Sequence, residues 1–385
     1  MNDPVFLIAG GGTGGHVFPG LAVADALCKL SPVRVVFVGA PKGLESRIVP
    51  MRGYPLELLD VEPMKGGGVT RAARGAAVAA KATLKARALV ARYKPRAILS
   101  VGGYAAGPMS LAGALGGVPL AVLEPNRTLG LANKILAPFA KRAYLAFGDT
   151  SGAFRKSGVR QFGVPLREGF RAQGGAQGKP PSLLVLGGSQ GAKAINDRMP
   201  DVVDRLCRSY PDLSVLHQVG AGQEELVRVA YGARPNVRVV PFVDEMAKEM
   251  TRASVIVSRA GAITVAEICA IGRASVLVPF PFAAGDHQAE NAFALQKLGG
   301  ALAVRQAEAT VDRLAAALGD LLGDEAKRNQ MAECARAHGK PSAAMEIAKD
   351  LLALGGVRDM GTATEQDQTH TSGGAGMAFA QTAVG

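Results

Sequence analysis

The chain has 385 residues, of which 48% are apolar, 20% are charged and 49 are glycine. The four cysteines are far apart and no stretch approaches about 18 uninterrupted apolar residues, which excludes a disulfide framework and a membrane-spanning helix. Lysine and arginine (44) exceed aspartate and glutamate (32), and the net charge of +12 predicts anionic partners: nucleotides, nucleic acid or an acidic membrane surface.

The first half of the chain alternates short apolar runs with stretches of helical spacing. The apolar runs are predicted as strands, at residues 6–9, 33–38, 97–101, 120–123 and 143–146. Helical spacing occurs at residues 20–30 and 71–93. Strands that alternate with helices predict a parallel sheet covered on both faces.

Five glycines lie within the six residues that follow the first predicted strand, and His16 comes next. Glycine lets a backbone approach a ligand closely, and the following helix offers free N–H groups to a phosphate. The spacing matches that of dinucleotide-binding proteins, but the second strand ends in Gly39-Ala40 instead of the acid that binds ribose. The Gly-Lys-Ser/Thr sequence that ends a P-loop is also absent. Two interpretations remain: a tight turn that binds nothing, with a structural His16, or a ligand loop of another kind, in which His16, with an ordinary pKa of ~6.5, takes a proton from a hydroxyl. A second glycine loop in the matching position of the other half favours the ligand loop.

Residues 63–123 contain no aspartate or glutamate but many lysines and arginines. Part of this basic run has helical spacing interleaved with apolar residues, and the basic residues assigned to docking are Arg71, Arg74, Lys81 and Lys85. One interpretation is a solvated basic face; the other is docking on an anionic membrane surface, at ~1 kcal/mol per basic residue. Nucleic acid is disfavoured because aromatic residues that stack on bases are few.

The segment 170–182 is rich in glycine, glutamine and proline and is predicted as an interdomain linker. After it, strand, glycine loop and helix begin again at residues 183–196, followed by predicted strands at residues 214–218, 237–241, 254–258 and 275–279. We therefore predict two similar α/β domains, at residues 1–164 and 165–341. Residues 357–385 are polar and aperiodic and are predicted to form a disordered tail.

In the second half, most candidate ligand-binding residues lie at 258–272, a stretch predicted to form a strand end, a glycine turn and a helix. The helix N–H groups and the Thr264 hydroxyl suit a diphosphate, and Glu267 can accept hydrogen bonds from ribose hydroxyls. Asp286, His287, Gln288 and Asn291 form a polar cluster suited to sugar hydroxyls, with a polar helix cap as the alternative. The folded part has no D-x-D pair, so we predict neither a metal site nor a cofactor.

Six stretches together resemble one family: GGGTGGHVFPGLAVA, VGGYAAGP, GVPLR, GGSQGA, SRAGAITVAE and DHQAENA. They are similar, in the same order, to the bacterial glycosyltransferases that add N-acetylglucosamine from UDP-N-acetylglucosamine to undecaprenyl-diphospho-N-acetylmuramoyl-pentapeptide (lipid I). The product of that family is lipid II of peptidoglycan. The resemblance covers residues 5–355.

The resemblance implies a GT-B fold: two Rossmann-like α/β domains whose parallel sheets face a cleft. It implies that the donor lies mainly on the second domain and the lipid acceptor on the first, and that a helix at residues 342–356 returns to the first domain. It also implies a peripheral enzyme on the cytoplasmic face of the inner membrane. Inverting transfer to the 4-hydroxyl of the acceptor is the implied reaction.

The same resemblance assigns site residues. His16 is implied to be the catalytic base, and Glu124 and Asn291 are candidate sugar or acceptor contacts. The implied donor-binding residues are Thr13, Gly14, Gly15, Asn126, Arg167, Ser189, Val243, Ala262, Ile263, Thr264, Val265, Ala266, Glu267 and Gln288. The chain departs from the family pattern at Leu123, Pro125 and Val164, positions that bear on acceptor contacts and local loop shape.

Three alternatives share these features. Two are enzymatic: sugar transfer to a different lipid acceptor, and epimerisation of the UDP-sugar. The third is a regulator that binds a nucleotide sugar without turning it over.

Overall fold

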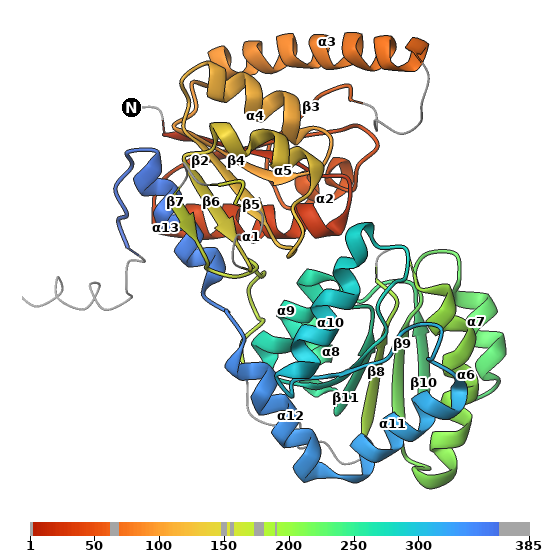
Figure 1. The fold of residues 1–385 in the computed structure, drawn as a ribbon. Helices are drawn as coiled ribbons and strands as arrows, with labels where there is room; N and C mark the ends of the chain where they lie inside the picture. The colour runs from red at the N-terminus through yellow and green to blue at the C-terminus, as the bar shows by residue number, and fades with distance from the viewer. Residues whose placement is uncertain are drawn as a thin grey trace, which may run out of the picture.

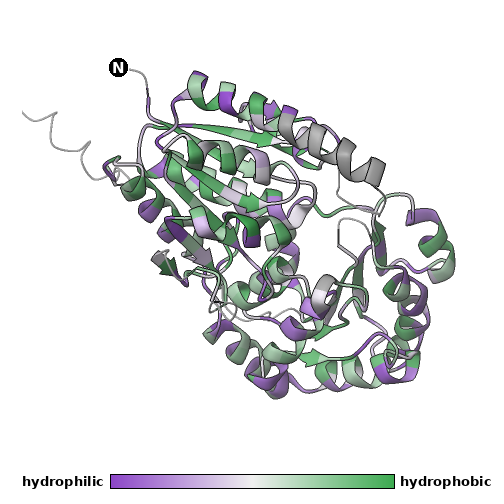
Figure 2. Ribbon diagram, turned by 45° about the horizontal axis from the view of Figure 1, so that its top comes forward, coloured by the Kyte–Doolittle hydropathy of each residue, from purple (hydrophilic) through white to green (hydrophobic). Residues whose placement is uncertain are grey.

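The computed structural model describes residues 3–61, 69–147, 152–154, 158–172, 181–188 and 191–361, with the backbone alone for residues 69–80. These residues form two parallel sheets, each with helices on both faces (Figure 1). The predicted α/β class with two Rossmann-like sheets is confirmed. Figure 2 shows the strands of both sheets mostly in the colour of hydrophobic residues, as expected for strands buried on both faces.

The first sheet has the strand order β3-β2-β1-β4-β5-β6-β7. Its strands are β1 (Val5–Gly10), β2 (Arg34–Gly39), β3 (Leu56–Leu58), β4 (Ala97–Gly102), β5 (Leu120–Glu124), β6 (Arg142–Leu145) and β7 (Gly158–Arg160). The order reverses between β1 and β4, which makes the carboxyl ends of these two strands the switch point where such sheets bind ligands.

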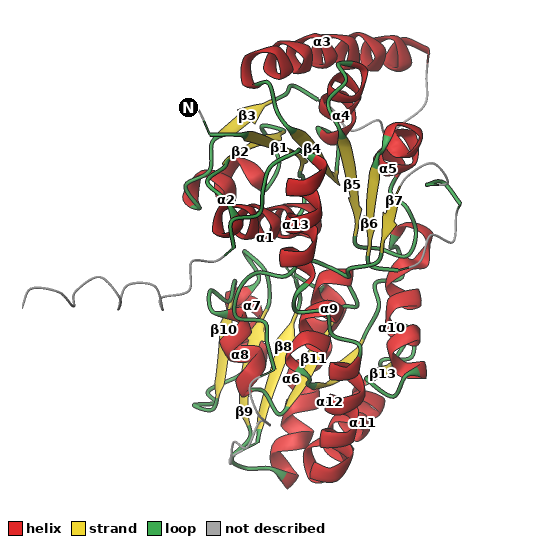
Figure 3. Cartoon of the chain, turned by 90° about the vertical axis from the view of Figure 1, so that its left-hand side faces the viewer, coloured by secondary structure: helices red, strands yellow, loops and turns green. Residues whose placement is uncertain are grey.

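Helices cover the two faces of this sheet in separate groups. They are α1 (Gly14–Leu30), α2 (Glu45–Met51), α3 (Val69–Tyr93), α4 (Ala106–Leu115), α5 (Leu131–Leu136) and the 3-10 turn η1 (Ala137–Phe139). Phe6 and Ile8 of β1 pack with α1, whereas Leu7 and Ala9 pack with α3 and α4. Figures 1 and 3 place α3 at the end of this domain farthest from the second sheet.

The second sheet repeats the design with the order β10-β9-β8-β11-β12-β13. Its strands are β8 (Ser182–Leu186), β9 (Ser214–Gln218), β10 (Val237–Val240), β11 (Val255–Ser258), β12 (Ala274–Leu277) and β13 (Leu302–Ala303). Its helices are α6 (Lys193–Ser209), α7 (Glu224–Tyr231), α8 (Met246–Arg252), α9 (Ala262–Ile271), α10 (His287–Lys297), α11 (Val311–Gly323) and α12 (Glu325–Ala337). Here the switch point lies between β8 and β11.

The last helix, α13 (Ala343–Leu354), packs against α1 of the first sheet (Figure 3). Ile347, Leu351 and Leu352 are fully buried in the same core as Phe6. The chain therefore crosses between the two sheets twice. The boundaries 1–164 and 165–341, with residues 342–356 assigned to the first domain, stay a proposal. Of the tail predicted at 357–385, residues 362–385 lie outside the described part of the chain.

Asp350 joins α13 to the first sheet. Its carboxylate accepts hydrogen bonds from the Tyr144 hydroxyl at 2.8 Å and from Nε of Arg142 at 3.0 Å. We expect Asp350→Ala to lower the free energy of unfolding by about 1–3 kcal/mol, because the Tyr144 hydroxyl loses its acceptor. Urea denaturation measures this change. Asp201→Ala, on the exposed side of α6, is the control, and an equal loss in both variants would contradict the prediction.

Candidate active site between two glycine loops

The loops after β1 and β4 meet backbone to backbone at the first switch point. The Gly11 N–H donates to the Gly102 carbonyl at 3.1 Å. A Cβ atom at Gly10 would overlap that carbonyl oxygen, and one at Gly103 would overlap the Gly11 carbonyl oxygen. Gly102 and Gly103 both have φ of 88°, in the left-handed region that favours glycine. The glycines therefore permit close contact between the two loops.

His16 lies in the first turn of α1, which begins at Gly14, six residues before the predicted helix at residues 20–30. Glycines and Pro19 look like helix breakers in the sequence, yet they are inside the helix here. His16 Nδ1 lies 3.1 Å from the Gly11 carbonyl oxygen and 3.3 Å from the Thr13 hydroxyl. Because a carbonyl only accepts, Nδ1 carries the proton, and the lone pair is on Nε2.

The ring of His16 has room because Gly102 has no side chain: a Cβ there would lie 3.0 Å from Nε2. Burial lowers the pKa of His16 below its ordinary value of 6.5, while the carboxylates of Glu124 and Glu45 and the hydrogen bond to Gly11 oppose this shift. The imidazole is therefore neutral at pH 7, and its Nε2 lone pair can accept a proton.

Glu45, at the start of α2, is a residue that the sequence analysis missed. Its side chain is buried, with 1% of the residue exposed. Its carboxylate accepts the Gly12 N–H at 2.6 Å and the Ala40 N–H at 2.8 Å. The first glycine loop thus has an acid beside it, but this acid binds the backbone of the loop itself and not a ribose. The available signal was a lone glutamate two residues after Gly43, in the loop that follows the second predicted strand.

Glu124 shapes the loop that follows β5. The residue is 3% exposed, and its carboxylate accepts the Gly130 N–H at 2.9 Å and the Asn133 side-chain amide at 3.0 Å. It also accepts the backbone N–H of Asn126 at 3.1 Å and the side-chain amide of Asn126 at 3.2 Å. The chain's own donors therefore occupy the carboxylate that the sequence analysis assigned to a sugar or acceptor contact. Glu124 orients Asn126 in this geometry.

The second switch point presents the N-terminus of α9. Residues Ile263, Thr264, Val265 and Ala266 are partly exposed there, whereas Ala262 and Glu267 are buried. The first N–H groups of a helix have no partner within it and attract anions. Burial raises the pKa of Glu267 to about 7, although the nearby Arg167 guanidinium lowers it.

Arg167 connects the two switch points. Its Nη2 lies 3.7 Å from Oε1 of Glu267 in the second domain. Its guanidinium carbon lies 4.5 Å from the centre of the Phe18 ring in α1 of the first domain. Lys29 of α1 also forms an ion pair of 2.7 Å with Glu168. These contacts bring the helix that carries His16 and the helix that carries Glu267 to the same guanidinium.

Buried side-chain amides fix the loops that follow β8 and β11. Asn291 is 2% exposed and donates to the Ala260 carbonyl at 3.1 Å, so it holds the loop before α9. Gln218, missed by the sequence analysis, accepts the Gly188 N–H at 3.0 Å and donates to the Gly188 carbonyl at 2.8 Å. A polar residue at the end of a buried strand was the available signal.

The remaining predicted residues fall in three groups. Thr13 and Gly15 are exposed and Gly14 is buried beside His16, while Gln288 accepts the Phe280 N–H at 3.0 Å. The Val243 side chain is buried, so that only its backbone groups can contact a ligand. Ser189 lies outside the described residues, as do the side chains of Arg71 and Arg74.

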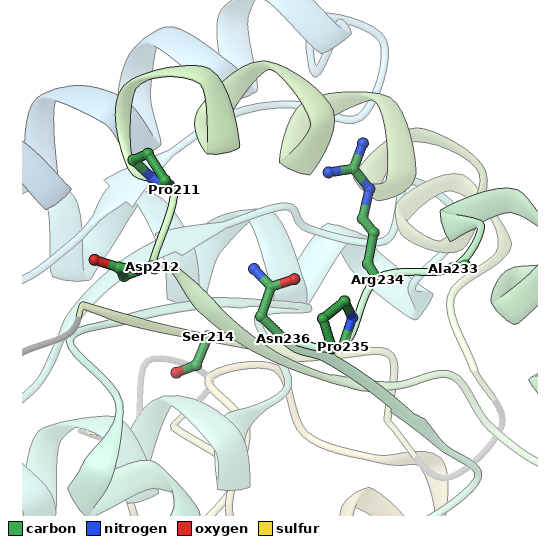
Figure 4. Close-up of a pocket in the computed structure, with 7 residues that line it drawn as sticks. All are labelled: Pro211, Asp212, Ser214, Ala233, Arg234, Pro235 and Asn236. Atoms are coloured by element: carbon green, nitrogen blue, oxygen red, sulfur yellow. The ribbon is translucent and has the colours of Figure 1, made fainter.

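A separate depression lies at the other end of the second sheet (Figure 4). It is lined by Pro211, Asp212, Ser214 and residues 233–236, at the amino ends of β9 and β10. Ligands of parallel sheets bind at the carboxyl ends, so we assign the site to the glycine loops instead. Within the described ranges, no three or more His, Cys, Asp or Glu side chains gather as a metal site would need.

Family models match both halves of the chain. The glycosyltransferase family 28 N-terminal domain matches residues 6–145, and the C-terminal domain of the same family matches residues 182–347. The fold, the two switch-point loops and these matches define the class: a glycosyltransferase of family 28.

Proteins similar in sequence specify the family within this class. The UDP-N-acetylglucosamine–N-acetylmuramyl-(pentapeptide) pyrophosphoryl-undecaprenol N-acetylglucosamine transferase of Sorangium cellulosum is 49% identical over 90% of this chain and 88% of its own length. The enzyme of that name from Myxococcus xanthus is 39% identical over 89% of this chain and 91% of its own. The chain belongs to this family of N-acetylglucosamine transferases.

Solved structures agree with this assignment. The crystal structure of Acinetobacter baumannii MurG is similar with a TM-score of 0.74 and 33% identity, over 91% of this chain and all of that one. A UDP-GlcNAc 2-epimerase from Neisseria meningitidis, bound to UDP-GlcNAc, has a TM-score of 0.61 at 12% identity, over 91% of this chain and all of that one. The second likeness shows a shared fold alone.

Proposed function

We propose that this chain transfers N-acetylglucosamine from UDP-N-acetylglucosamine to the 4-hydroxyl of lipid I, which forms lipid II, and that His16 is the catalytic base. Membership of the N-acetylglucosamine transferase family supports the reaction. The observation that carries the role of His16 is the contact of Nδ1 with the Gly11 carbonyl, which leaves Nε2 as the acceptor beside both glycine loops.

The reaction is a single displacement with inversion. As the acceptor oxygen attacks the anomeric carbon of the donor, its proton passes to Nε2 of His16. The new bond joins that oxygen to the anomeric carbon, and the bond from this carbon to the diphosphate breaks, so that UDP leaves. The N-terminus of α9, Thr264 and Arg167 offset the charge that develops on the diphosphate.

The other predicted donor residues have supporting roles in this proposal. Glu267 accepts hydrogen bonds from the ribose hydroxyls, and Gln288 and Asn126 contact the sugar. Thr13, Gly14 and Gly15 lie beside the donor at the start of α1. Val243 and the α9 residues Ala262, Ile263, Val265 and Ala266 complete the donor site through backbone groups and close packing. The family resemblance adds Ser189, which lies outside the described residues.

The experiment that tests the function follows labelled N-acetylglucosamine from its UDP donor to lipid I and compares transfer with UDP release. Equal amounts of labelled lipid and UDP are the expected result. A labelled epimer of the donor in place of labelled lipid would contradict the proposal, as would donor binding without any turnover.

We also propose that the first domain docks on an anionic cytoplasmic leaflet, where a lipid-linked acceptor resides. No helix within the described ranges combines the length and apolar character needed to cross a bilayer. Neighbouring helices nevertheless expose large apolar side chains: Leu84 on α3, Leu115 on α4, Leu131 and Ile135 on α5, and Phe139 on η1. Exposed Lys81, Lys85 and Lys134 lie on the same helices. Apolar side chains combined with lysines favour an interfacial position.

Charge reversal tests the docking. We expect Lys81→Glu with Lys85→Glu to weaken binding to anionic vesicles at least about 30-fold, because the loss of each positive charge removes ~1 kcal/mol near such a surface and the new carboxylates repel it. Vesicle sedimentation at low salt measures the affinity, and high salt should reduce the difference. Lys297→Glu with Lys349→Glu, exposed on α10 and α13, is the matched control. Equal binding by both double variants would contradict the proposal.

A further inference from the structure

Glu45 has no part in the reaction as described, yet its carboxylate is the most enclosed acid beside the first glycine loop. It is 1% exposed and comes from α2, a helix that follows β2. Its two oxygens accept hydrogen bonds from two different loops: Oε2 from Gly12 after β1, and Oε1 from Ala40 after β2. The carboxylate therefore joins neighbouring strand ends.

The site around this carboxylate is built from glycine. A Cβ atom at Gly11, Gly39 or Gly43 would overlap the Glu45 side chain. The absence of three side chains leaves a space that the carboxylate fills. An acid enclosed in this way keeps one position, because both of its oxygens are bonded and its surroundings are close-packed.

A single peptide unit links Glu45 to His16 through hydrogen bonds. The Gly12 N–H that Glu45 accepts and the Gly11 carbonyl that holds His16 Nδ1 belong to the same peptide bond. A peptide bond is planar, so a fixed N–H direction also fixes the direction of its carbonyl. Hydrogen bonds in such a chain polarise one another, which strengthens the acceptor at Gly11.

We infer that Glu45 is a positioning residue for His16: by fixing the Gly11–Gly12 peptide plane, it keeps the proton on Nδ1 and the lone pair on Nε2. This inference rests on the proposed function only for the role of His16 as a base. The orientation of the ring and its tautomer follow from the geometry alone, and they can be measured without any substrate.

The charge of Glu45 also acts on His16, through the pKa of its ring. The carboxylates that raise the pKa of His16 are Glu124 at the end of β5 and Glu45 at the start of α2, and burial opposes both. Removal of the Glu45 charge should therefore lower the pKa of His16 further. A variant that keeps the Glu45 charge but moves the carboxylate separates the effect of the charge on the pKa of His16 from the effect of the carboxylate's position on the Gly11–Gly12 peptide plane.

The test uses two variants of the full chain. Glu45→Gln keeps the shape but turns an amide N–H₂ toward one of the two N–H donors, and Gly43→Ala keeps the charge but displaces the carboxylate. For both, we expect kcat for sugar transfer to fall roughly 10- to 100-fold, since small displacements of a catalytic group have effects of this size. The KM for UDP-N-acetylglucosamine should change less than about two-fold, because most of the proposed donor contacts lie on α9 and at Arg167, away from Glu45.

The decisive readout is the ring nitrogen spectrum of His16, recorded by ¹H–¹⁵N NMR and assigned among the five histidines with His16→Gln. Both variants should lose the preference for the Nδ1–H tautomer, and Glu45→Gln should also lower the pKa of His16. Glu57→Gln, a carboxyl change on β3 where the partners are Arg92 and Tyr93, is the control. A wild-type tautomer and pKa in both variants would overturn the inference. If the wild type transfers no sugar, the proposed function fails while the spectrum still decides the role of Glu45.

Discussion

His16→Ala is expected to lower kcat for sugar transfer by about 10²- to 10⁴-fold, the usual contribution of a positioned general base. The KM for UDP-N-acetylglucosamine should stay within about three-fold of wild type, because the ring acts on the acceptor proton and Glu267 lies on the other domain. Single-turnover transfer to lipid I measures the chemical step directly.

The pH dependence of the same reaction tests the protonation state. The pKa of His16 lies below 6.5, so the neutral ring predominates above that pH and the rate should fall as the pH decreases through the pKa. This acidic limb should disappear in His16→Ala. His338→Ala, whose ring contacts the Cys334 carbonyl on α12, is the matched control and should keep the wild-type rate. A full rate in His16→Ala would remove His16 from the mechanism.

Glu267→Gln is expected to weaken binding of UDP-N-acetylglucosamine about 10- to 100-fold, because hydrogen bonds to a charged carboxylate contribute ~1.5–3 kcal/mol. The pKa of Glu267 is about 7, so its charged fraction grows between pH 6 and pH 8. Donor affinity of the wild type should therefore rise across this range, whereas the affinity of the glutamine variant should stay flat. Calorimetric titration at several pH values measures both effects.

The same residue links pH to stability. The carboxyl has a pKa of about 7 in the folded chain against an ordinary value of 4.5, so the folded state binds the proton more tightly. Stability is therefore lost as the pH rises from 4.5 through 7, by up to ~3 kcal/mol. Glu267→Gln should gain stability relative to wild type over this range. Glu290→Gln, exposed on α10, should follow the wild-type curve, and an unchanged Glu267→Gln curve would contradict the prediction.

The fold could be predicted from the sequence where strands are long and buried on both faces. Apolar runs located all five predicted strands of the first sheet within one or two residues. They missed β3, β7 and β13, which have two or three residues each and lie near sheet edges, where few side chains need to be apolar. The start of α1 was also missed, because the tertiary structure holds glycine and Pro19 in a helix that local propensity disfavours.

The candidate site was predicted in part. His16 and Glu267 follow glycine turns that are visible in the sequence. Glu45 and Gln218 were missed because each acts on a glycine loop of a neighbouring strand, and strand neighbours are a property of the sheet order. The role of Glu124 could not be predicted either, since only the folded loop shows four donors directed at its carboxylate.

The position of α13 has a consequence for synthesis. The core around Phe6 is complete only when Ile347, Leu351 and Leu352 arrive, and the ribosome makes these residues after the whole second domain. Domains usually fold in the order of their translation. Here the second sheet and its helices, which form a continuous stretch of chain, are finished first. We therefore expect the part of the protein that is translated first to be the last to reach its native stability.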